Sequence, residues 1–213
     1  MKKTIIVLSM VLLAAMLFVS CDNKANESEI TYKVGDKGPS GGYIFYDCDA
    51  DNTEDGGAGE DGLKSSVCGW RYLEAAPSDA TTVEGSTTTD FPSWGPDGKN
   101  YGTETGIGKG KSNTELILEE TGDFPAFNAC AEYGKDTKYT DWFLPSKDEL
   151  NLMYTVLKVE KKTGSFAAEW YWSSSEAAAP SDDRVEQHFS DGDTNESGGE
   201  RAFAKVRPVR RFK

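Results

Sequence analysis

The chain is poor in the side chains that most enzymes use for catalysis. It has one histidine, His188, among 213 residues. Without a partner histidine or an obvious cysteine nucleophile, neither a zinc site nor a catalytic triad can be assembled. The serines Ser173 to Ser175 lack the Gly-x-Ser-x-Gly context of a nucleophile elbow. Asp148 and Glu149 are adjacent at the start of a helix, where carboxylates cap the helix end. The sequence therefore predicts a protein that is not an enzyme.

Basic residues are also scarce. There are 23 Lys and Arg against 36 Asp and Glu, a formal net charge of −13. Nucleic-acid binding needs a basic face that displaces counterions, and adsorption to anionic lipid needs one as well. We expect no nucleic-acid partner. The 22 glycines predict a fold rich in loops.

One long apolar run is present, at the N-terminus. Lys2 and Lys3 precede it, and residues 4–19 form a stretch of about 16 residues, shorter than the roughly 20 of a membrane-spanning helix. A basic start, a short apolar segment and a small residue before Cys21 are typical of a signal peptide. The ending resembles a relaxed lipobox. We therefore expect residues 1–20 to be removed and Cys21 to carry acyl chains such as palmitate. An ordinary secretory signal is the alternative.

The expected mature chain consists of a tether and one domain. Residues 21–31 are polar and predict a flexible tether, and residues 32–213 have the length of a single domain. Loss of Lys2 and Lys3 takes the formal charge to about −15. Acyl chains on Cys21 would make the membrane a partner, at the outer membrane or the cell surface. Asp22 leaves retention at the inner membrane open.

Three cysteines remain after Cys21. Cys48 and Cys68 bracket an acidic, glycine-rich loop and are the plausible disulfide pair, because export permits disulfides. Three free thiols are the alternative. Cys130 lies in an alanine-rich, helical stretch and is expected to be a small buried apolar residue.

The acidic loop offers several hard oxygen ligands. Asp47, Asp49 and Asp51 alternate along the chain, and carboxylates of this kind suit calcium. An EF-hand loop would have Gly and Glu where this chain has Asn52 and Ala58. A solvated acidic loop is therefore the alternative, and we expect no other cofactor.

Apolar patterning predicts an α+β fold with two or three helices. A Ser–Glu capping box at Ser146 and Glu149 predicts one helix start, and Ser112 is expected to cap another. Phe124 to Tyr133 is expected to form a helix as well. The expected strands are 43–46, 69–76, 140–145, 170–176, 184–189 and 202–212.

Several of these segments together resemble one bacterial family. They are Val34–Tyr46, Trp70–Pro77, Ile107–Thr114, Asp141–Leu150, Tyr171–Glu176 and Val206–Arg210. In this order they resemble the domain of unknown function typified by the C-terminal domain of the Legionella collagen-like adhesin, a relative of the Fibrobacter major paralogous domain. The helix start and the Trp-Ser-Ser strand also resemble C-type-lectin-like and sulfatase-modifying-factor folds. Relatives often have a cysteine where Gly95 follows Trp94 here, so any family disulfide at that loop is absent.

The resemblance implies a surface-exposed, non-catalytic module, and the named adhesin domain binds sulfated glycans. Arg210 and Arg211 belong to the one basic cluster of the chain, and Trp94 and Trp172 could stack on sugar rings. The alternatives are pairing of the arginines with the surplus acids, and tryptophans that belong to the core.

Three functions are therefore expected in order of preference. The first is a surface binding or adhesion lipoprotein whose ligand is a glycan or host matrix. The second is an envelope structural or protein-interaction lipoprotein without a sugar ligand. The third is an enzyme related to sulfatase-modifying factors, an activity that would need cysteine chemistry from Cys48, Cys68 or Cys130.

Overall fold

The computed structural model describes residues 30–50, 65–84, 87–178, 181–198 and 204–213. The chain divides into two compact units, Met1–Thr31 and Tyr32–Lys213, and nearly all described residues belong to the second. The expected signal peptide and Cys21 lie outside the described part. Within that part, every helix is too short or too polar to cross a membrane.

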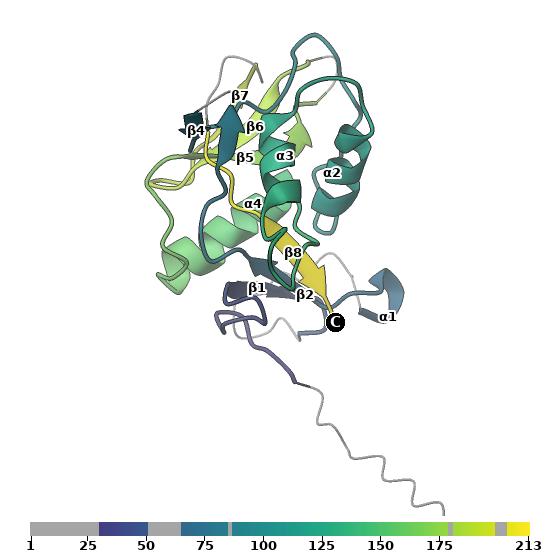
Figure 1. Ribbon diagram of the computed structural model, residues 1–213. Coiled ribbons are helices and arrows are strands. Elements are labelled where there is room, and N and C mark those ends of the chain that lie inside the picture. Colours follow the sequence, from purple (N-terminus) through teal and green to yellow (C-terminus); the bar gives the residue numbers. More distant parts are fainter. Residues whose placement is uncertain (1–29, 51–64, 85–86, 179–180, 199–203) are drawn as a thin grey trace, which may run out of the picture. The chain divides into compact units, whose positions relative to one another are not determined.

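The fold is α+β, as the sequence predicts, and its strands pair antiparallel (Figure 1). One sheet has the order β1 (Tyr43–Asp47), β2 (Tyr72–Ala75) and β8 (Val209–Phe212). Another has the order β5 (Trp170–Glu176), β6 (Arg184–His188) and β7 (Thr194–Ser197). A small hairpin joins β3 (Thr82–Glu84) and β4 (Thr87–Thr89). The last strand thus pairs with β2, more than a hundred residues earlier in the chain.

Two proline-flanked segments form less sheet than the sequence predicts. The expected strand 140–145 is reduced to one bridge between Phe143 and Val209, and Pro145 ends it. The expected strand 202–212 is regular only at β8. Lys205 and Val206 make isolated bridges, and Pro208, which has no N–H to donate, separates them from β8. Residues 202 and 203 lie outside the described part.

Four α-helices occur in the described residues (Figure 1): α1 (Ser65–Cys68), α2 (Gly110–Leu118), α3 (Pro125–Glu132) and α4 (Lys147–Met153). The sequence predicts two or three, and the additional one is α1, which has only four residues. The predicted capping box opens α4. The Ser146 hydroxyl accepts from the Glu149 N–H, and the Glu149 carboxylate accepts from the Ser146 N–H at 2.8 Å. The helix continues into a π-helical turn, η1 (Tyr154–Glu160).

The predicted cap of α2 is wrong. Its N-cap is Lys109, without a side-chain cap, and Ser112 lies inside the helix with its hydroxyl donating to the Lys109 carbonyl at 2.9 Å. The helix begins earlier because Gly110, lacking a Cβ, can lie directly against the Glu149 carboxylate and the backbone around Leu144. That close approach is a tertiary contact that a local pattern does not reveal.

Two hydrophobic clusters hold these elements together. In the first, Phe45 and Leu73 of the β1–β2–β8 sheet pack with Met153 and Leu157 of α4 and η1. The second surrounds Trp94 and includes Phe127 of α3 and Trp172 of β5. Helix α4 contacts β1, β5 and β6, so it links the two larger sheets.

Glu149 should make the stability of the domain depend on pH. Its side chain is fully buried, and burial raises its pKa from 4.5 to about 7, although N–H donors of Ser146 and Gly108 act in the opposite direction. The folded protein therefore binds this proton more tightly than the unfolded chain. We expect the free energy of unfolding to fall by up to about 3 kcal/mol as the pH rises from 4.5 to 7, and to level off above.

Urea unfolding between pH 4.5 and 8 measures this dependence. Glu149→Gln has a side chain that cannot ionise. It should therefore flatten the slope of the free energy of unfolding against pH within that window, whatever its effect on absolute stability. Equal slopes for the variant and the parent protein would contradict the assignment.

Candidate functional site

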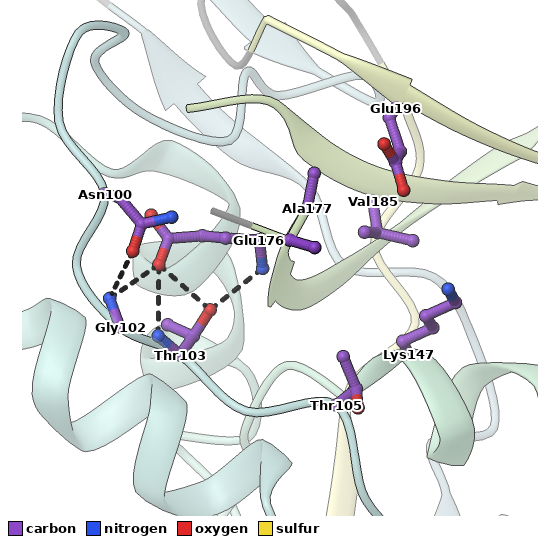
Figure 2. Close-up of a pocket in the computed structure, with 10 residues that line it drawn as sticks. Asn100, Gly102, Thr103, Thr105, Lys147, Glu176, Ala177, Val185 and Glu196 are labelled. Carbon is purple, nitrogen blue, oxygen red and sulfur yellow. Dashed lines mark hydrogen bonds between the residues drawn. The ribbon is translucent and has the colours of Figure 1, made fainter. Parts of the chain in front are cut away.

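A pocket of about 350 Å³ opens beside the end of β5 (Figure 2). Its walls come from the loop between β4 and α2, the start of α4, the end of β5, and strands β6 and β7. The lining residues are Asn100, Gly102, Thr103, Thr105, Lys147, Glu176, Ala177, Ala178, Val185 and Glu196. The pocket thus depends on the tertiary structure, because it joins segments almost a hundred residues apart.

Glu176 holds the loop wall of this pocket in place. Its carboxylate accepts from three successive backbone N–H groups, those of Tyr101, Gly102 and Thr103, at 2.8 to 3.0 Å. The Thr103 hydroxyl accepts in return from the Glu176 N–H at 2.8 Å (Figure 2). Gly102 has a φ of +82°, a conformation that glycine adopts without strain.

Arg184 neutralises Glu176 from within the protein. Neither side chain is appreciably exposed, and their ion pair measures 2.7 Å. The Arg184 guanidinium also donates to the carbonyls of Pro96 and Lys99 at 3.1 and 2.9 Å, and it lies 4.3 Å from the centre of a Trp94 ring. Donors thus occupy both oxygens of Glu176, and this carboxylate holds the loop in place.

The opposite wall of the pocket carries charges of both signs. Figure 2 shows Lys147 and Glu196 on the same side of the cavity, with Val185 near them. Lys147 is half-buried and Glu196 is exposed. With respect to other described residues, neither side chain forms an ion pair within 4.0 Å. The pocket therefore offers an available ammonium and an available carboxylate beside an apolar surface of Ala177 and Val185.

A second pocket, of about 190 Å³, has three aromatic rings among its seven lining residues. It includes Tyr133, Tyr139 and Trp142, and the rings of Tyr133 and Trp142 are 5.2 Å apart at 82°. Most of its polar side-chain atoms already form hydrogen bonds within the protein. The Trp142 N–H donates to the Tyr139 carbonyl, and the Tyr133 hydroxyl lies 3.0 Å from that of Ser78. This pocket therefore offers a polar ligand fewer partners than the larger one.

The tryptophans predicted to stack on sugars belong to the core, which corrects that prediction. Trp94 and Trp172 have no exposed surface. The Trp94 indole N–H donates to the Ser173 carbonyl at 2.8 Å, and that of Trp172 donates to the Pro92 carbonyl at 2.9 Å. A side chain without exposed surface cannot contact a ligand in this conformation.

The prediction that Arg210 binds an anionic ligand is also wrong. Its guanidinium is buried, donates to both oxygens of Asp141 at 2.9 and 3.1 Å, and pairs with Glu74 at 3.3 Å. Arg207 is buried against Asp79 in the same way. Internal pairing was the alternative expected for this cluster. Arg211 differs, because it is half-exposed and donates to the Gly108 carbonyl at 3.3 Å.

The acidic segment predicted to bind calcium is only partly described. Asp47 accepts from Arg71 at 2.8 and 2.9 Å, and Asp49 accepts from the Ser65 N–H at 2.9 Å. Asp51 lies outside the described residues. Within the described ranges, no three His, Cys, Asp or Glu side chains are grouped to hold a metal ion. Calcium at Asp47 and Asp49 would therefore compete with Arg71 and Ser65.

The serines of β5 form hydrogen bonds within the fold. The Ser173 hydroxyl donates to the Val185 carbonyl, and that of Ser175 donates to the Glu104 carbonyl, both at 2.8 Å. His188 contacts Ser190 and Asp191 through one ring nitrogen, Nδ1, at 2.8 and 3.0 Å. In a catalytic triad the serine and the acid would contact different ring nitrogens, so these residues do not form one.

Cys48 and Cys68 are neighbours, as their predicted pairing requires, but they are thiols in this structure. Their sulfur atoms are 3.8 Å apart, against about 2 Å in a disulfide. Burial, Cys68 and the charges of Asp49 and Asp47 raise the pKa of Cys48 to about 12. Cys130 is fully buried, as predicted, and burial raises its pKa as well.

A search against protein-family models found no match, and a search of curated proteins found none either.

The pocket residues Lys147, Glu196 and Thr105 are not singled out by the sequence as ligand contacts. They stand in no shared motif, and only Lys147 has a recognisable local setting, beside the capping serine of α4.

We predict that oxidised glutathione converts Cys48 and Cys68 to a disulfide, with loss of two hydrogens from the protein and formation of two reduced glutathione molecules. The half-exposed Cys68 is the thiol that the reagent can reach. Closure of a loop of this length, with the cysteines 20 positions apart, should stabilise the protein by about 3 kcal/mol. Mass spectrometry and urea unfolding with and without reductant measure both effects.

Cys130→Ala should leave the difference in the free energy of unfolding between oxidised and reduced protein unchanged, whereas Cys68→Ser should abolish that difference. Reactivity of both Cys48 and Cys68 toward a thiol reagent after oxidation and unfolding would disprove the pairing.

Proposed function

We propose that this protein is a lipid-anchored surface lipoprotein whose folded domain binds carbohydrate without catalysis. The single observation that carries the carbohydrate assignment is the pocket at the end of β5. It places the exposed Thr105 beside an apolar surface, and sugar rings likewise combine hydroxyl edges with an apolar C–H face. An architecture like that of C-type lectins is part of the proposal.

The favoured ligand is an unsulfated sugar. A sulfated glycan would need several available cations, but Arg207 and Arg210 are buried in ion pairs with the protein's own carboxylates. The excess of acids would also repel a polyanion at low ionic strength. A sulfated ligand would have to rely on Arg211 and Lys213, which lie outside this pocket.

The anchoring part of the proposal rests on the N-terminal pattern. The short apolar segment before Cys21 and the polar residues after it match an anchor followed by a tether. Such an anchor would hold the pocket near a membrane surface, at the outer membrane or the cell surface, where glycans are abundant.

A glycan array with the mature chain tests carbohydrate binding. We expect retention of unsulfated sugars, and loss of that retention in Thr105→Trp, because an indole at this exposed position would fill the pocket. Thr140→Trp is the matched control, since Thr140 is exposed but does not line the pocket. If no glycan is retained at low salt, or if both variants bind equally well, carbohydrate binding through this pocket is excluded.

Metabolic labelling with a palmitate analogue tests the anchor. The full chain expressed in a bacterium should incorporate the label and partition into detergent, whereas Cys21→Ala should do neither, because the acylated thiol is missing. An unlabelled parent protein would exclude lipidation while leaving the pocket assignment untouched.

A further inference from the structure

The pocket at the end of β5 has two poles of opposite charge, and its geometry defines the ligand more narrowly than carbohydrate in general. Lys147 provides a cation from the first turn of α4, and Glu196 provides an anion from β7. Both side chains lie on the same side of the cavity (Figure 2). Neither is neutralised by a described residue within 4.0 Å.

The other charged group of the pocket does not take part. Glu176 lines the cavity, but Arg184 and three backbone N–H groups occupy its carboxylate. The ligand therefore meets one available cation and one available anion, a balanced pair on a chain that is otherwise strongly acidic.

The surface beside these poles is apolar. Ala178 is exposed there, and Val185 and Ala177 line the cavity with little exposed surface. Since a charge is poorly solvated beside apolar groups, a ligand charge held there gains more from an opposite charge than it would in open water. A ligand with a single charge would satisfy one pole and leave the other without a partner.

We propose that the pocket binds a zwitterionic sugar, one that carries both a free ammonium and a carboxylate. Its carboxylate pairs with Lys147 and its ammonium pairs with Glu196. The sugar ring lies over the exposed Ala178, and the exposed Thr105 contacts the ring hydroxyls through its own hydroxyl. This assignment rests on the proposed carbohydrate-binding function and adds to it the charges that the ligand must have.

Four related monosaccharides separate the two charges. Muramic acid has both an amine and a carboxylate, N-acetylmuramic acid has the carboxylate alone, glucosamine has the amine alone, and N-acetylglucosamine has neither. Calorimetric titration of the mature chain with each at low salt should give the highest affinity for muramic acid. Each single-charge sugar should bind roughly tenfold more weakly, because one charge-assisted hydrogen bond is missing.

Two variants assign the poles. Lys147→Met keeps the length of the side chain and removes its charge, so it should weaken binding of muramic acid and N-acetylmuramic acid and leave glucosamine unchanged. Glu196→Gln should weaken binding of muramic acid and glucosamine and leave N-acetylmuramic acid unchanged. Lys111→Met is the control, since Lys111 is a half-buried lysine of α2 that does not line the pocket.

The outcomes distinguish this inference from the function on which it rests. Equal affinities for all four sugars, or sugar selectivities that neither variant changes, would overturn the zwitterion assignment and leave carbohydrate binding in place. Absence of binding by all four sugars, together with an empty glycan array, would overturn both. Because neither position is buried in the core, loss of folding is not expected, and circular dichroism of each variant checks it.

Discussion

The buried ion pair between Glu176 and Arg184 is the interaction on which the pocket and its surroundings depend. It joins the ends of β5 and β6 where their register shifts, and through backbone groups it fixes the loop that precedes α2. The Trp94 ring packs against the same guanidinium. Loss of one partner from such a pair leaves an uncompensated buried charge, at a cost of about 3 to 5 kcal/mol. The loop that forms the pocket wall, the core residue Trp94 and the ends of β5 and β6 are therefore coupled through this ion pair.

The same principle explains how the protein uses its scarce arginines. Arg207 and Arg210, like Arg184, are buried, and each meets carboxylates from distant parts of the chain. Since a buried charge must be paired, these arginines tie the C-terminal segment to the domain. They are therefore unavailable to an anionic ligand. At the pocket, by contrast, Lys147 and Glu196 are available to a ligand.

The proposed function and the fold are connected through rigid elements. The backbone of Lys147 lies at the start of a capped helix, and its N–H donates to the Ser175 hydroxyl at 2.9 Å. These contacts fix the position of its Cα. Glu196 is on a strand that pairs with β6, which supplies Val185 and Arg184. The backbone positions that carry both charges are therefore already ordered, so binding would have to order only the two side chains.

Local patterns were sufficient for the sequence to determine the fold class, the capping box at Ser146, and the strands at β1 and β5, because each depends on side chains a few residues apart. Only the tertiary structure decided that α2 starts at Gly110, that Trp94 and Trp172 are core residues, and that Arg210 is an internal partner. These outcomes depend on groups far away in the chain: the Trp94 N–H meets the Ser173 carbonyl across 79 positions, and Arg210 meets Glu74 across 136. The pocket belongs with these features, since Asn100 and Glu196 line one cavity only when the sheets and the loop are packed together.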